Sequence, residues 1–139
     1  MIGRLIGLDH GSKRIGLAVS DGLGIVAREL GIVHRTNDAR DFEQILAAAR
    51  REGACGFVVG VPHNPNAPKG VELQADKVKR WIERLRSYTD LPISEVSEYL
   101  TSAEARDLAR QLKRKPGEPI DDLAARVILQ SYLDAQSYS

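Results

Sequence analysis

Two short apolar runs near the N-terminus, Leu5–Leu8 and Ile15–Val19, stand on either side of a connection that contains Gly11. Runs of this length are typical of buried strands, and the connection is short enough for a β-hairpin. The first run ends on a carboxylate, Asp9. A carboxylate is costly to bury without a partner, so its place at the end of a buried strand raises the question of what it binds.

The rest of the chain changes from strand to helix patterns and back. A third strand is expected over Ile25–Val33, and further elements follow in the order helix, strand, helix, strand, helix, helix. Their sequence positions are a helix from Asp38 to Glu52, a strand at GFVVGVP, a helix over Val71–Leu85, a strand at LPISEVSEYL, a helix near Thr101 and a last helix from Asp121. This order predicts an α/β fold with a mixed five-stranded sheet, its first three strands antiparallel, and helices on both faces.

Composition restricts the class of protein. The 139 residues, 42% of them hydrophobic, are expected to form a single domain, residues 1–139. The net charge of +1 provides no global attraction to a polyanion, so any nucleic-acid binding must depend on a local arrangement of charge. The single cysteine, Cys55, allows no disulfide within the chain and is expected in the core. No signal peptide or membrane span is evident, so we expect a cytoplasmic protein.

Acidic residues occur at the ends of three separate elements. Asp9 ends the first strand, Glu98 ends the last strand, and Asp121 and Asp122 open the final helix. In open sheets, ligands bind beyond the carboxyl ends of the strands, so these groups could share one edge. Carboxylate oxygens without histidine or cysteine favour Mg²⁺ or Mn²⁺ over zinc. Two such ions, about 3.5–4 Å apart, can activate water and stabilise the leaving oxygen of a phosphodiester.

Each acid also has a simpler interpretation. Asp9 could accept hydrogen bonds from amides of the hairpin turn, and Glu98 could be an exposed loop residue. Either Asp121 or Asp122 could be a helix N-cap, because aspartate is favoured there and complements the helix dipole. Only the set of three favours a catalytic metal site.

Four blocks of the sequence resemble, in order, those of the YqgF family of Holliday-junction-resolvase-like proteins, also described as pre-16S ribosomal RNA nucleases. The blocks are GLDHGSKRIGLAVSD, VVGVP, SEYLTSAEA and IDDLAARVILQSYLD, and the resemblance runs from about residue 4 to residue 134. It implies a ribonuclease H-like fold with strand order 3-2-1-4-5. It places the active-site acids, which are also the metal ligands, at Asp9, Glu98 and Asp121. The implied function is metal-dependent endonucleolytic cleavage that matures the 5′ end of the 16S ribosomal RNA.

The chain departs from the family pattern in two places. Ser97 and Tyr99 flank Glu98 where the family usually has aspartate and arginine. The loss of the arginine could weaken phosphate binding, because a guanidinium binds phosphate through two hydrogen bonds and tyrosine cannot. After VVGVP, Asn64 and Gly70 fit the family pattern but the residues between them do not.

Basic residues near these acids are candidates for contacts with nucleic acid. Lys13 and Arg14 lie in the first hairpin turn beside Asp9, and we expect them to contact phosphates; Asn64 and Arg106 are further candidates. Other basic residues crowd the third helix and the loop after it: Arg110, Lys113, Arg114 and Lys115. The basic residues of the second helix fit a solvated face better.

Three alternatives to an RNA nuclease stay open. The first is a Holliday-junction resolvase acting on DNA, although such enzymes generally work as dimers and this chain is expected to be a monomer. The second is a nucleic-acid-binding module without catalysis, which the Ser97 and Tyr99 departures would suit. The third is a kinase or ATPase, because the segment from Asp9 to Asp21 resembles the phosphate-contacting hairpin of the actin superfamily. Those proteins need two related domains, and this chain has room for one.

Overall fold

The N-terminal hairpin forms the centre of a five-stranded sheet. The structure, a computed structural model, describes residues 3–62, 68–98 and 101–137. Its elements in chain order are β1 (Arg4–His10), β2 (Arg14–Ser20), β3 (Ala27–His34), α1 (Asp38–Glu52), β4 (Ala54–Pro62), α2 (Lys69–Arg86), β5 (Ile93–Glu98), α3 (Thr101–Gln111) and α4 (Asp121–Ser137).

The strand order is β3-β2-β1-β4-β5. Strands β1, β2 and β3 pair antiparallel, whereas β4 pairs parallel with β1 and β5 pairs parallel with β4. This confirms the predicted mixed sheet. Because β1, β4 and β5 run in the same direction, they end at the same edge of the sheet, at His10, Pro62 and Glu98. We call this edge the carboxyl edge.

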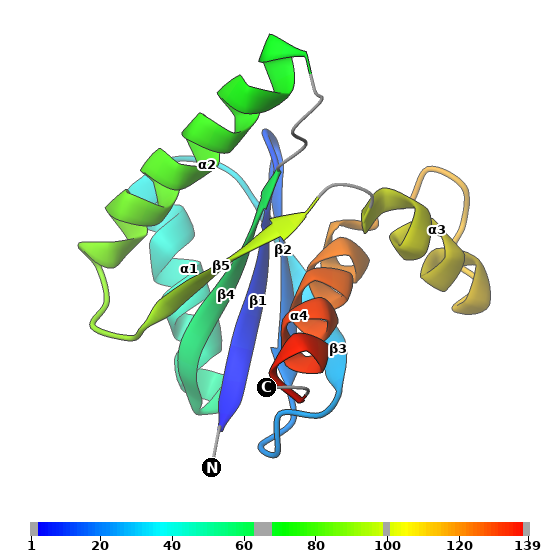
Figure 1. Cartoon of the computed structure of the whole chain (residues 1–139), viewed down its shortest axis with the longest axis horizontal. Coiled ribbons are helices and arrows are strands. Elements are labelled where there is room, and N and C mark those ends of the chain that lie inside the picture. The colour runs from blue at the N-terminus through cyan, green and yellow to red at the C-terminus, as the bar shows by residue number, and fades with distance from the viewer. Residues whose placement is uncertain (1–2, 63–67, 99–100, 138–139) are drawn as a thin grey trace.

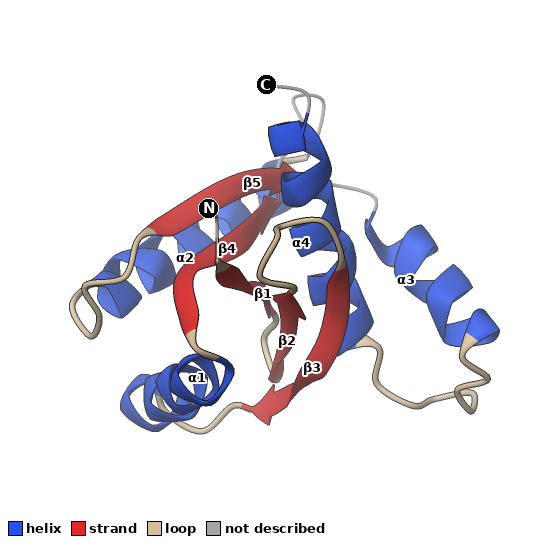
Figure 2. Cartoon of the chain, turned by 90° about the horizontal axis from the view of Figure 1, so that it is seen from below, coloured by secondary structure: helices blue, strands red, loops and turns tan. Residues whose placement is uncertain are grey.

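Helices cover the sheet on both faces (Figures 1 and 2). On one face, α1 and α2 bury Phe42, Trp81 and Ile82 against strand residues such as Ile6 and Leu8. Each of these side chains is fully buried. Burial of a large apolar side chain contributes about 1.5–3 kcal/mol, so this face holds much of the stability.

The opposite face is covered by α4, with α3 lying outside it (Figure 2). Here the strands carry small residues, and α4 approaches them closely. A Cβ added to Gly7 would lie 2.8 Å from the Cβ of Leu129, and one added to Gly60 would lie 2.5 Å from the Cδ1 of Ile128. The absence of side chains at these strand positions therefore lets α4 pack directly on the backbone of the sheet.

Two expectations from the sequence are wrong. Cys55 is exposed, because it is the extra residue of a bulge near the start of β4, where the register with β1 shifts from the pair Arg4/Ala54 to the pair Leu5/Gly56. The third strand begins at Ala27 rather than at Ile25, because Ile25 and Val26 belong to the β2–β3 turn and are more than half exposed. None of the described helices combines the length and apolar character needed to cross a bilayer.

Candidate metal and nucleic-acid site

Asp9 lies at the carboxyl edge, on the face of the sheet that α4 covers. Its neighbour Leu8 belongs to the core on the α1–α2 face, and side chains alternate along a strand. The strand partner of Asp9 is Gly16 on β2. A Cβ added to Gly16 would overlap the carbonyl oxygen of Asp121 and lie 2.8 Å from the backbone nitrogen of Asp122. The first turn of α4 thus rests on the strand position paired with Asp9.

Burial and the negative charge of Asp121 both act on the Asp9 carboxylate. Together they raise the pKa of Asp9 from 3.8 to about 6, and burial is the larger cause. No donor among the described residues makes a hydrogen bond to the Asp9 carboxylate. A desolvated carboxylate with a second carboxylate beside it is an arrangement that a cation would stabilise.

Asp121 is held by the predicted nucleic-acid contact Arg14. The Nε of Arg14 donates a hydrogen bond of 2.6 Å to Oδ2 of Asp121, and both side chains are partly exposed. Arg14 is therefore an ion-pair partner of one of the candidate catalytic acids.

Asp122 has a different environment from its neighbour. Arg114 donates two hydrogen bonds to its carboxylate, of 2.7 and 2.8 Å, and the Leu123 amide donates a third of 3.0 Å. Asp122 is buried, with 7% of its surface exposed. The sequence did not decide whether Asp121 or Asp122 belongs to the site. Asp122 is bound to Arg114, and Asp121 is the acid that lies near Asp9.

For the third predicted acid, Glu98, the structure describes the backbone but not the side chain. Glu98 is the last residue of β5, and its backbone pairs with Pro62. Its side chain lies outside the described part of the structure, as does the whole of Asn64. Among the side chains that are described, no three carboxylate, histidine or cysteine groups form a metal-binding cluster.

His10 belongs to a separate network on the other face of β1. Its ring lies 4.8 Å from that of Trp81, and its Nε2 is 3.1 Å from Nη1 of Arg35. Burial, and after it the positive charge of Arg35, lower the pKa of His10 from 6.5 to about 4. At neutral pH the ring is uncharged, so Nε2 accepts the hydrogen bond from Arg35.

Arg35 also fixes the hairpin turn that carries Lys13 and Arg14. Its Nη1 donates to the carbonyl of Gly11 at 3.0 Å, and its backbone nitrogen donates to the carbonyl of Lys13 at 2.9 Å. On its other side it pairs with Asp38 and with the fully buried Asp41. Lys13 is exposed in this turn, and Arg106 is exposed on α3.

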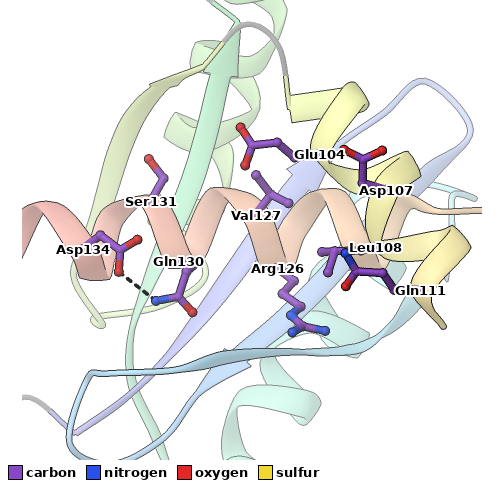
Figure 3. Close-up of a pocket in the computed structure, with 9 residues that line it drawn as sticks. All are labelled: Glu104, Asp107, Leu108, Gln111, Arg126, Val127, Gln130, Ser131 and Asp134. Atoms are coloured by element: carbon purple, nitrogen blue, oxygen red, sulfur yellow. Dashed lines mark hydrogen bonds between the residues drawn. The ribbon is translucent and has the colours of Figure 1, made fainter.

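A groove of about 540 Å³ lies between α3 and α4 (Figure 3). Glu104 and Asp107 line it from α3, and Asp134 lines it from α4. Its one arginine, Arg126, is paired with Glu29. With this excess of carboxylates the groove is not suited to phosphate, and Asp9 does not line it.

A family model described as "RuvX: Holliday junction resolvase" matches residues 3–135. The chain belongs to the RuvX family. Two curated relatives carry the name "Putative pre-16S rRNA nuclease". The one from Synechococcus sp. (strain JA-3-3Ab) is 41% identical, over 96% of this chain and 85% of its own length. The one from Ligilactobacillus salivarius is 40% identical, over 97% of this chain and 95% of its own. The predicted resemblance to the YqgF family is thereby confirmed.

Solved structures confirm the ribonuclease H-like fold of this RuvX-family chain. RuvC of T. thermophilus, in complex with a Holliday junction substrate, superimposes with a TM-score of 0.61 at 12% identity and covers 96% of each chain. The fowlpox virus resolvase, in complex with substrate Holliday junction DNA, gives a TM-score of 0.57 at 10% identity, over 96% of this chain and 98% of its own. At such identities the likeness concerns the fold alone.

Sequence reasoning missed two residues that organise this RuvX-family site, Arg35 and Arg114. Arg35 bonds to the Gly11 carbonyl, 24 residues away, and Arg114 bonds to Asp122, 8 residues away, and neither spacing is a helix or strand repeat that would mark the pair in the sequence. The signal for Arg114 was its place in a basic run, which a solvent-exposed loop would show equally. Arg35 directly follows the third strand, and nothing in the sequence distinguishes it from an exposed, unpaired arginine.

Proposed function

We propose that residues 1–139 form one nuclease domain that hydrolyses phosphodiester bonds in nucleic acid with a divalent cation, and that its substrate is the 5′ region of precursor 16S ribosomal RNA. The observation that carries this proposal is the approach of Asp121, at the start of α4, to Asp9, at the end of β1. RuvX membership and the names of the curated relatives support the reaction class and the substrate.

The two acids fit a divalent cation. The Asp9 carboxylate is partly buried, receives no hydrogen bond from a described residue and lies near a second negative charge. Hard oxygen donors of this kind suit Mg²⁺ or Mn²⁺. Asp9 and Asp121 would hold the ion, with Glu98 as the third ligand expected from the sequence. When bound, the ion would supply water activation and stabilisation of the leaving oxygen.

The protein's own groups prepare this site. Arg14 holds the Asp121 carboxylate in a fixed direction through a 2.6 Å hydrogen bond. The turn before it is fixed by Arg35, so the Lys13 side chain starts from a defined position beside Asp9. Lys13 would contact a phosphate near the scissile bond, and Arg14, Asn64 and Arg106 remain the other predicted contacts.

RNA is the favoured substrate because the relatives carry an RNA nuclease name, whereas the family description favours branched DNA. A junction resolvase makes paired cuts and generally needs a dimer. We propose a monomer that makes single cuts, working in the cytoplasm where precursor ribosomal RNA is found in bacteria.

Cleavage assays test the proposal. The protein is incubated with a transcript of the 5′ precursor region or with a four-way DNA junction, in Mg²⁺, Mn²⁺ or EDTA. We expect cutting of the transcript that requires the ion and is lost in Asp9→Asn and Asp121→Asn. The matched control is Asp134→Asn, near the far end of α4, which should cut normally.

The outcomes separate the candidate functions. Preferential cutting of the junction would replace the RNA assignment with the resolvase. Binding of either nucleic acid without cutting under any divalent ion would favour the non-catalytic module, in line with the Ser97 and Tyr99 departures.

A further inference from the structure

The turn that ends α3 has a backbone conformation unusual for its residue. Lys113 has a φ of 58°, and among the described residues it is the one non-glycine with a positive φ. Its amide donates to the carbonyl of Arg110 at 3.1 Å, and the Arg114 amide donates to the carbonyl of Ala109 at 2.9 Å. These two bonds define a Schellman motif, in which the position of Lys113 usually belongs to glycine. A lysine here costs free energy that glycine would not.

The residues after Lys113 hold this turn rigidly against α4. Arg114 donates two hydrogen bonds to Asp122 and a third, of 2.9 Å, to the carbonyl of Pro119. The Lys115 amide donates to Oε1 of Glu118 at 2.9 Å, and the Glu118 amide donates back to the carbonyl of Lys115 at 3.1 Å. The backbone positions of Lys113 and Lys115 are therefore fixed, and the Arg114 side chain between them ties the turn to Asp122, the residue next to Asp121.

The charges of this turn are only partly balanced. Arg114 is neutralised by Asp122, and on α3 Arg110 is paired with Asp107. Lys113 and Lys115 are exposed, and no carboxylate of the described part of the chain forms an ion pair with either. The turn thus presents two unpaired ammonium groups on the connection between α3 and α4.

Stabilisation of the helix dipole does not explain the lysine at this position. A cation near the C-terminus of α3 would be favourable, but Arg110 already lies in its last turn. A basic residue in that last turn would have the same effect without a left-handed backbone. Residues held in disfavoured conformations often serve a function that repays the strain.

We propose that Lys113 and Lys115 bind the sugar-phosphate backbone of the substrate beside Asp121. This inference rests on the proposed function, since it requires a nucleic-acid substrate. The turn would supply a second set of phosphate contacts, from the α3–α4 connection, in addition to Lys13 in the β1–β2 turn. Contacts of this type fix the position of a strand without reading its sequence.

Binding measurements with the full chain test the inference. Fluorescein-labelled probes, the precursor transcript and a four-way DNA junction, are titrated in EDTA at several KCl concentrations, and binding is followed by anisotropy. The variants are Lys113→Gly, Lys115→Gln and the double variant. The matched control is Lys79→Gln, an exposed lysine on α2.

The expected result joins a gain in stability with a loss of affinity. Lys113→Gly should raise the midpoint of thermal unfolding by about 3 °C, because glycine relieves the positive φ. The double variant should bind about fivefold to tenfold more weakly, and its salt dependence should fall by about 0.7–0.9 per lost phosphate contact. Lys79→Gln should match the wild type in both measurements.

Other results would overturn the inference. If the wild type binds and cuts nucleic acid, and the double variant has the same affinity and salt dependence, then Lys113 and Lys115 do not bind substrate and the nuclease proposal stands. If Lys113→Gly lowers the unfolding midpoint, the lysine stabilises the C-terminus of α3, and its positive φ is no sign of a binding role. If the wild type binds neither probe, this inference and the proposed function both fail.

Discussion

Gly16 and Asp121 touch through their backbones: the Asp121 carbonyl oxygen occupies the space in which a side chain on Gly16 would begin. The contact joins the centre of the sheet to the first turn of α4. Since Gly16 is the strand partner of Asp9, the same contact sets how Asp121 stands relative to Asp9. A residue with no functional group therefore controls the geometry of the candidate site.

Replacing Gly16 by alanine should displace the start of α4. The added methyl group would meet backbone atoms of Asp121 and Asp122, which cannot rotate away as a side chain can. We expect a loss of roughly 1–3 kcal/mol of unfolding free energy, measured by urea denaturation, and a loss of cleavage. Gly31→Ala is the control, because a Cβ on that strand residue would meet nothing within 4 Å. Equal stability of the two variants would disprove the contact.

Asp9→Asn should stabilise the protein at high pH in EDTA. The pKa of Asp9 is about 6 in the folded protein and 3.8 for the free group. The folded state therefore holds this proton more tightly, and the stability that Asp9 contributes is present below pH 3.8 and lost as pH rises through 6. Asparagine cannot ionise, so above pH 6 the variant should be more stable by on the order of 2 kcal/mol. The gain should vanish near pH 4. A difference in unfolding free energy that stays constant with pH would show that the ionisation of Asp9 does not cause it.

His10 should show the opposite pH dependence. Its pKa is about 4 in the folded protein and 6.5 for the free group, so the stability it contributes is present above pH 6.5 and lost as pH falls toward 4. The contributions of Asp9 and His10 thus largely cancel between pH 4 and 6.5. Urea denaturation at several pH values should give a nearly flat profile for the wild type. With rising pH, the unfolding free energy should fall in His10→Gln and rise in Asp9→Asn. Profiles of the same slope in the two variants would show that Asp9 and His10 do not make opposite contributions.

Asp122→Asn should destabilise the fold far more than an exposed acid does. The change leaves the partly buried Arg114 without its charged partner, and such a loss costs roughly 2–4 kcal/mol. Asp107→Asn removes an exposed ion pair with Arg110 and should change stability by less than about 0.5 kcal/mol. Denaturation midpoints of the two variants measured side by side check this, and similar midpoints would show that the Arg114–Asp122 pair is not structural.

The sheet could be predicted from the sequence because short apolar runs, such as Leu5–Leu8 and Ile15–Val19, are typical of buried strands. It placed Asp9 and Asp121 at element ends, and the fold brings these ends together. It could not predict that Arg14 bonds to Asp121, because a side-chain partner a hundred residues away leaves no local pattern. The burial expected for Cys55 was wrong for a related reason: an apolar run indicates a buried strand, but it does not show where the strand register shifts and inserts one extra residue.

Manganese binding tests the central claim most directly. Electron paramagnetic resonance of free Mn²⁺ during titration gives the affinity and stoichiometry for the wild type, Asp9→Asn, Asp121→Asn and the control Asp134→Asn. Binding by the wild type and by Asp134→Asn, weakened at least tenfold in the other two variants, is the result that one shared cation site predicts. Equal affinity in all four proteins, or no binding by the wild type, would contradict it.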